Sequence, residues 1–87
     1  MHAHQKQLET CMLNLLKNLT LGLTGQEIPI EEKEVEGVMV YTIKAPKEVM
    51  GILIGKSGKT IRAIRNVAKA RAIIDQTRIS IDLEEAV

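Results

Sequence analysis

The tetrapeptide Gly55-Lys56-Ser57-Gly58 restricts the fold more than any other feature, because it places two glycines between two apolar segments. No acidic residue occurs in positions 49–74, whereas half of the 12 Lys and Arg residues lie there. A chain with a formal net charge of only +1 therefore gathers its cations around one turn. This distribution indicates a surface that receives the backbone of a polyanion.

Length and composition predict one small domain over residues 1–87. Cys11 is the only cysteine, so no internal disulfide forms, and we expect a buried thiol in a reducing, cytoplasmic setting. His2 and His4 have no further His or Cys to complete a metal site, so no metal is expected. No apolar run approaches the ~18 residues of a membrane span, and no export signal is present. We therefore expect a soluble protein without membrane association.

Tyr41 is the only aromatic residue of the chain. The chain consequently lacks the platform on which RRM, OB-fold and cold-shock modules stack bases. Any bound nucleic acid has to be held by main-chain groups, cations and aliphatic side chains.

Apolar residues at helical spacing predict three helices. The first covers about residues 4–21. Its defining residues are Leu8, Cys11, Met12, Leu15, Leu16 and Leu19 in the apolar stripe, with Gly22 and Gly25 at its end. The second begins at Ala45-Pro46, since proline is favoured at the first helical position, and ends at Gly55. The third runs from after Gly58 to about Ala72.

Three strands complete the pattern. Residues 28–35 are charged and contain Pro29, as edge strands do. After a turn at Glu36-Gly37, the nearly continuous apolar run 38–43 is typical of a central strand. Residues 78–83 alternate as a half-buried strand. The predicted order is α-β-β-α-α-β, and if the second and third strands are neighbours they pair in parallel with a right-handed crossover.

The glycine turn has both a structural and a chemical interpretation. Gly55 can end one helix with a positive φ, and Gly58 lets the next helix begin close by. A turn with few side chains at a helix N-terminus also presents unpaired N–H groups and the positive end of the helix dipole, which attract phosphate. Lys56 and Ser57 add a cation and a hydroxyl donor. Further cations on the following helix are Lys59, Arg62 and Arg65.

The stretch 51–64 resembles the signature of the KH domain, I-G-x-x-G-x-x-I-x-x-I. Its five defining positions are occupied by Ile54, Gly55, Gly58, Ile61 and Ile64. The element order is similar to the type II arrangement, and the whole chain resembles the small stand-alone bacterial KH proteins of the KhpA type. This resemblance implies an α+β fold with a three-stranded mixed sheet packed on one side by three helices, and a βααβ core over about residues 38–84.

The resemblance also implies a single-stranded RNA-binding protein that acts in post-transcriptional regulation or as an RNA chaperone. In KH domains the GXXG loop clamps the backbone of about four nucleotides, while the bases lie in an apolar groove. The residues implied to bind RNA are Gly55, Lys56, Ser57 and Gly58 in the loop, Lys59 and Arg62 beside it, Gly51 where a base approaches, and Ile54 and Ile61 in the groove floor. Core packing is the primary role expected for Ile54 and Ile61. A further set, Arg65, Lys69 and Arg71, is interpreted as a solvated helix face.

Other functional classes fit less well. A nucleotide-binding P-loop needs glycine five positions before Gly58, where Leu53 stands. A helix-turn-helix DNA reader stays an alternative, although an apolar groove beside a sheet suits unstacked bases better than a duplex. A protein-interaction or dimerisation module with the same fold is the other alternative, which the loop cation Lys56 disfavours. No catalytic arrangement can be assembled from two tail histidines and one cysteine, so neither an enzyme nor a cofactor is expected.

One such module covers only about four nucleotides and should bind weakly on its own. We therefore expect this protein to act as a homodimer, or together with another KH-containing, Jag-like protein.

Overall fold

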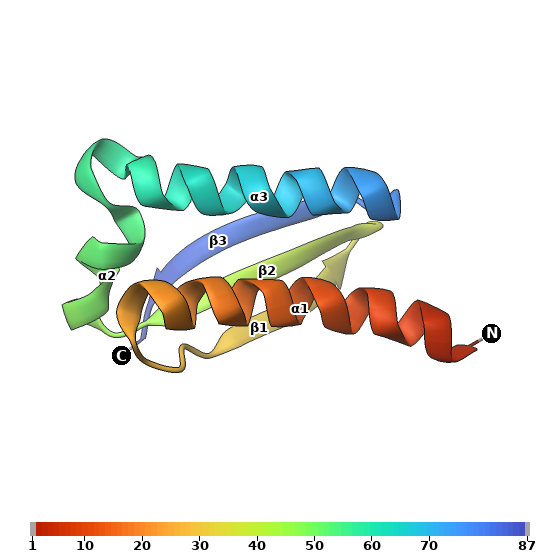
Figure 1. Cartoon of the computed structure of the whole chain (residues 1–87), viewed down its shortest axis with the longest axis horizontal. Coiled ribbons are helices and arrows are strands. Elements are labelled where there is room, and N and C mark those ends of the chain that lie inside the picture. The colour runs from red at the N-terminus through yellow and green to blue at the C-terminus, as the bar shows by residue number, and fades with distance from the viewer. Residues whose placement is uncertain (1, 87) are drawn as a thin grey trace.

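The computed structural model describes the backbone of residues 2–86 and the side chains of residues 12–86 (Figure 1). The expectations for the side chains of His2, His4, Leu8 and Cys11 lie outside the described residues. The elements are α1 (His2–Thr24), β1 (Ile30–Val35), β2 (Val38–Ala45), α2 (Lys47–Ile54), a 3-10 turn η1 (Lys56–Gly58), α3 (Lys59–Asp75) and β3 (Ile79–Glu85). The predicted α-β-β-α-α-β order is confirmed.

The sheet has the order β1-β2-β3, with β2 at its centre. Strands β1 and β2 form an antiparallel hairpin, joined by Glu36 and Gly37, which both have positive φ as tight hairpin turns require. Strands β2 and β3 pair in parallel, and α2 and α3 form the connection between them. The predicted edge strand, central strand and parallel pairing are confirmed.

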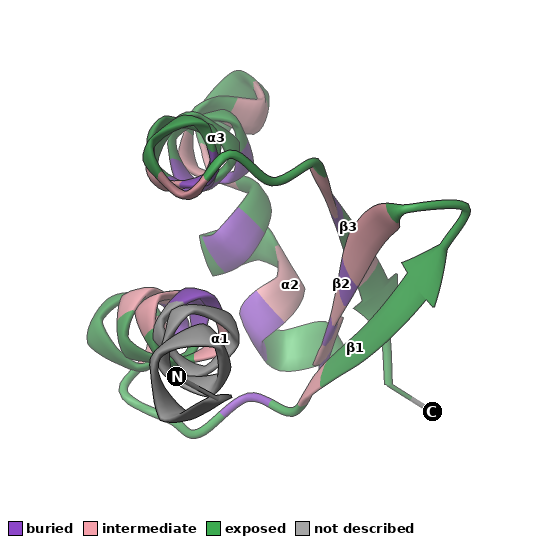
Figure 2. Ribbon diagram, turned by 90° about the vertical axis from the view of Figure 1, so that its right-hand side faces the viewer, coloured by how far each residue is buried: buried purple, intermediate pink, exposed green. Residues whose placement is uncertain are grey.

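All three helices lie on one face of the sheet (Figure 2). Inward-facing residues of β2, among them Tyr41, Ile43 and Ala45, are buried against them. The helices contribute most of the other core residues: Met12 and Leu16 from α1, Val49 and Leu53 from α2, and Ile61, Ile64, Ala68 and Ala72 from α3. Tyr41, the only Phe, Tyr or Trp of the chain, belongs to this core, so its ring is not available to stack on a base.

Helix α1 is longer than its apolar stripe predicts. It continues through Gly22 and ends at Thr24, where Gly25 takes a φ of 74° and donates its N–H to the Leu21 carbonyl at 2.7 Å. A glycine inside a helix costs only about 1 kcal/mol, so the contacts of α1 outweigh the stop predicted at Gly22. Thr20 is fully buried, and its hydroxyl is satisfied because it donates to the Leu16 carbonyl at 3.0 Å.

Two further helix boundaries differ from the prediction by a few residues. Pro46 is the N-cap of α2 rather than its first helical residue, since its ψ of 154° is extended. Helix α3 continues past Ala72 to Asp75 and stops at Gln76, which adopts a φ of 57°. No glycine marks this end, so the sequence contains no signal for it.

Candidate nucleic-acid interface

The loop between α2 and α3 begins with a residue that can only be glycine. Gly55 has φ 76° and ψ 172°, a conformation that side chains exclude. A Cβ atom on Gly55 would lie 2.7 Å from Thr60 Cβ and 2.8 Å from the Thr60 main-chain nitrogen. The main chain at Gly55 therefore lies directly against the main chain at Thr60, which keeps the turn between them narrow.

The next residues form one tight 3-10 turn. Ser57 and Gly58 are both left-handed, with φ values of 59° and 74°. The Gly58 N–H donates to the Gly55 carbonyl at 3.2 Å, and the Lys59 N–H donates to the Lys56 carbonyl. The predicted positive φ of Gly55 is confirmed, but these two N–H groups are already paired within the turn. These two N–H groups are therefore not free to donate to a phosphate, whereas the side chains of Lys56 and Ser57 are exposed.

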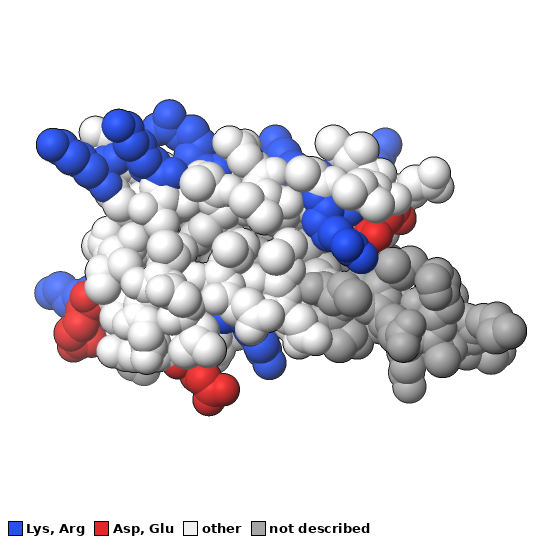
Figure 3. Space-filling model, in the orientation of Figure 1, with Lys and Arg blue, Asp and Glu red and all other residues white. Residues whose placement is uncertain are grey.

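The loop side chains are exposed and surrounded by cations. Lys56, Ser57, Lys59 and Arg62 are all exposed, and Figure 3 shows Lys and Arg gathered where α2 and α3 meet. Arg62 Nη2 donates to the Ser57 carbonyl oxygen at 2.9 Å, so this guanidinium holds the tip of the loop. Its remaining donors stay available for a phosphate.

The two isoleucines that were expected in the groove floor differ in their surroundings. Ile61 is 8% exposed and belongs to the core as expected, whereas Ile54 is 40% exposed at the end of α2, so the core packing expected for Ile54 is wrong. Gly51, one turn before the loop, is also exposed, and a Cβ atom placed there would meet nothing within 4 Å. Gly51 and Ile54 thus give an open, aliphatic surface beside the loop.

A hollow of about 220 Å³ lies between α3 and β3. It is lined by Arg65, Lys69, Ile79, Ser80, Ile81 and Asp82. Arg65 Nε donates to the Ile81 carbonyl at 3.1 Å. The Met39 N–H donates to the Arg78 carbonyl, so the even-numbered residues of β3 direct their main-chain N–H and C=O groups toward β2. The main-chain groups of Ile79 and Ile81 therefore point outward, away from β2. The hollow forms because β3 is the edge strand beside β2, and it was not predicted from the sequence.

Helical geometry separates the basic residues of α3 into two groups. Arg62, Arg65 and Lys69 share the side of α3 that faces β3. Arg71 lies apart from them and is half-buried, with Nε 3.1 Å from Asp75 Oδ2. Arg65 and Lys69, interpreted as a solvated face, therefore extend the loop cations toward the hollow, whereas Arg71 does not.

A second hollow, of about 310 Å³, borders the loop on the side of α1. Its lining is almost entirely apolar: Leu19, Leu23, Thr60, Ala63, Ile64 and Val67, with Lys59 at the end nearest the loop. A polyanion is drawn to the side that carries the cations, so the β3 side is the better candidate for nucleic acid.

The described residues contain neither a cluster of ligating side chains that could hold a metal ion nor a helix that is long and apolar enough to cross a membrane.

Comparison with known proteins identifies similarity over most of the chain. A family model described as KhpA/KhpB, KH domain, matches residues 14–83. A protein of Clostridium acetobutylicum named RNA-binding protein KhpA is 31% identical over 74 residues, which cover 83% of this chain and 99% of that protein. A Chlamydia pneumoniae protein of the same name is 32% identical over 76 residues, covering 85% of this chain and 97% of that protein.

Two solved structures share the fold. The chain is similar to part of Aquifex aeolicus Era Y63A bound to GDP.AlF4-, with a TM-score of 0.58 and 19% identity over 88% of this chain. It is also similar to part of Era in complex with MgGDPNP and a segment of 16S ribosomal RNA, with a TM-score of 0.55 and 20% identity over 84% of this chain. The match spans 30% and 29% of those chains, respectively.

Proposed function

The chain belongs to the KhpA/KhpB family of KH-domain proteins, and on that basis we propose that it binds single-stranded RNA through the loop Gly55–Gly58. Its element order and mixed sheet are those of a type II KH domain. The observation that carries the proposal is the exposed loop cation Lys56, which lies in a segment rich in cations and free of acidic residues.

The proposed path of the RNA follows the charge. The sugar-phosphate backbone runs over Lys56 and Ser57 and along Lys59 and Arg62, while the bases turn toward Gly51 and Ile54 and the hollow beside β3. There the outward main-chain groups of β3 are able to hydrogen-bond to base edges. Because Tyr41 is buried, its ring does not take part in base stacking.

Binding should prefer single strands and weaken with salt. We expect the logarithm of affinity to fall with the logarithm of salt concentration at a slope of roughly −0.7 per phosphate contacted. Fluorescence anisotropy with matched single-stranded RNA, single-stranded DNA and duplex DNA measures both properties. A flat salt response excludes the backbone clamp, and a preference for duplex DNA favours the helix-turn-helix alternative.

Two arginines of α3 give a matched test of the binding side. Arg65→Gln should weaken RNA binding by about tenfold, because it removes a cation from the hollow beside β3. Arg71→Gln makes the same change of charge on the other side of the helix and should leave affinity within about twofold. Equal effects of the two substitutions on anisotropy titrations would mean that only net charge matters.

The wider role follows from the affinity of a single module. We propose that the protein acts in the cytoplasm in post-transcriptional regulation or as an RNA chaperone. Because about four nucleotides give weak binding, it would act as a homodimer or with another KH-containing, Jag-like protein.

A further inference from the structure

Five of the 11 acidic residues lie in the segment 27–36, in and around β1 and away from the loop. Residues 27–36 contain five glutamates and one lysine, and every residue of β1 except Ile30 is exposed. Glu31 pairs with Lys44 across the outer face of the sheet at 2.8 Å, which lowers the pKa of Glu31 and raises the pKa of Lys44. No described cation pairs with Glu32 or Glu34. With few cations nearby, this acidic strand is a poor surface for a polyanion.

Strand β1 also presents unused main-chain hydrogen-bonding groups. The Lys44 N–H donates to the Pro29 carbonyl at 2.9 Å, which fixes the alternation along the antiparallel ladder. Residues 31, 33 and 35 therefore bond to β2, whereas Ile30, Glu32 and Glu34 direct their N–H and C=O groups outward. No main-chain hydrogen bond among the described residues reaches these outward groups.

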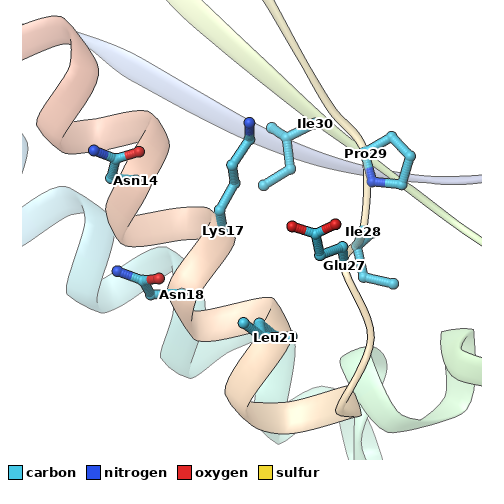
Figure 4. Close-up of a pocket in the computed structure, with 8 residues that line it drawn as sticks. All are labelled: Asn14, Lys17, Asn18, Leu21, Glu27, Ile28, Pro29 and Ile30. Carbon is cyan, nitrogen blue, oxygen red and sulfur yellow. The ribbon is translucent and has the colours of Figure 1, made fainter.

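A groove of about 610 Å³ opens beside the start of this edge, between α1 and β1 (Figure 4). It is lined by Asn14, Lys17, Asn18 and Leu21 of α1 and by the segment 27–30. Lys17 extends from the helix toward Ile30, and the Glu27 carboxylate points back toward the helix. The side chains of an added strand could contact apolar, amide and charged residues in this groove.

We propose that β1 is a docking edge for an extended basic segment of another protein, which adds to the sheet as a fourth strand. Main-chain bonds to Ile30, Glu32 and Glu34 supply the pairing, and basic side chains of the segment pair with Glu32 and Glu34. The strand side chains at 30, 32 and 34 face the helical layer, as their partners Ile43, Tyr41 and Met39 do. A second copy of this chain is a poor occupant, because it would place glutamates opposite glutamates.

The test uses a synthetic peptide, acetyl-(Lys-Val)4-amide, titrated into the ¹⁵N-labelled protein. Shifts are expected at the amides of Ile30, Glu32 and Glu34 and at the side-chain amides of Asn14 and Asn18. A peptide of the same sequence with alternate amides N-methylated keeps the charge but cannot pair, and should bind at least about tenfold more weakly. Glu32→Pro should have the same effect, because it removes the outward N–H together with the carboxylate, whereas Glu32→Gln removes the carboxylate alone and should bind within about threefold of wild type.

The comparison of the two peptides uses the unmodified protein, so it stands even if Glu32→Pro does not fold. Equal binding of both peptides, or no binding at millimolar peptide, overturns the proposal. Shifts at the same amides caused by protein concentration alone, or by an RNA oligonucleotide, overturn it in favour of a second copy or of nucleic acid.

Discussion

The double substitution Lys56→Asp with Ser57→Asp should weaken RNA binding by at least about 50-fold, because it replaces a cation and a neutral donor by two carboxylates where phosphate would lie. The fold should survive. Both positions are exposed, and aspartate tolerates the left-handed conformation that Ser57 adopts. Anisotropy titrations measure the loss, and circular dichroism with thermal melting confirms the fold.

The matched control is Lys17→Asp with Asn18→Asp, which makes the same change in net charge at two exposed positions of α1. This control should bind RNA within about threefold of wild type at moderate salt, where distant charges are screened. If the two double variants lose affinity equally, net charge rather than the loop governs binding. If the loop variant keeps wild-type affinity, the loop is not the RNA site.

Gly55→Ala should destabilise the protein by about 2–4 kcal/mol, a large part of the roughly 5–10 kcal/mol available to a domain of this size. The backbone of Gly55 occupies a region that only glycine populates, and the new Cβ atom would press on the Thr60 main chain. Adding Thr60→Ala should restore little, because the Thr60 nitrogen remains 2.8 Å from that Cβ position. Urea denaturation followed by circular dichroism gives the free energies.

Two other glycines serve as controls for this prediction. Gly58→Ala should cost about 1–2 kcal/mol, since its left-handed φ is unfavourable but the nearest atom, Arg62 Nη2, is 3.8 Å away. Gly51→Ala should raise stability by about 0.5–1 kcal/mol, because the position is helical and open. The same variant should weaken RNA binding if a base approaches Gly51. A cost at Gly55 no larger than that at Gly58 would show that the close contact with Thr60 does not matter.

Most of the fold was predictable because its signals are local. The stripe of α1, the alternation of β3 and the Glu36-Gly37 turn each follow from residues a few positions apart. The ends of helices were less predictable. Gln76 stops α3 without a glycine, and Gly22 does not stop α1, since tertiary contacts outweigh a cost of about 1 kcal/mol there.

The candidate site was predictable only in part. The loop and its cations are contiguous in sequence, so the KH signature alone located them. The position of Arg65 beside β3 depends on a parallel pairing between residues about 40 positions apart, which no local pattern encodes. The close contact between Gly55 and Thr60 was also not predictable, because the signature specifies the glycine but not the residue that packs against it.

The buried position of Tyr41 has a practical consequence for spectroscopy. As the chain has no tryptophan or phenylalanine, the near-ultraviolet signal comes from this one phenol on the central strand, at 2% exposure. Changes in its emission during denaturation report the opening of the sheet interior, and a bound oligonucleotide cannot quench that emission by ring contact while the interior stays closed.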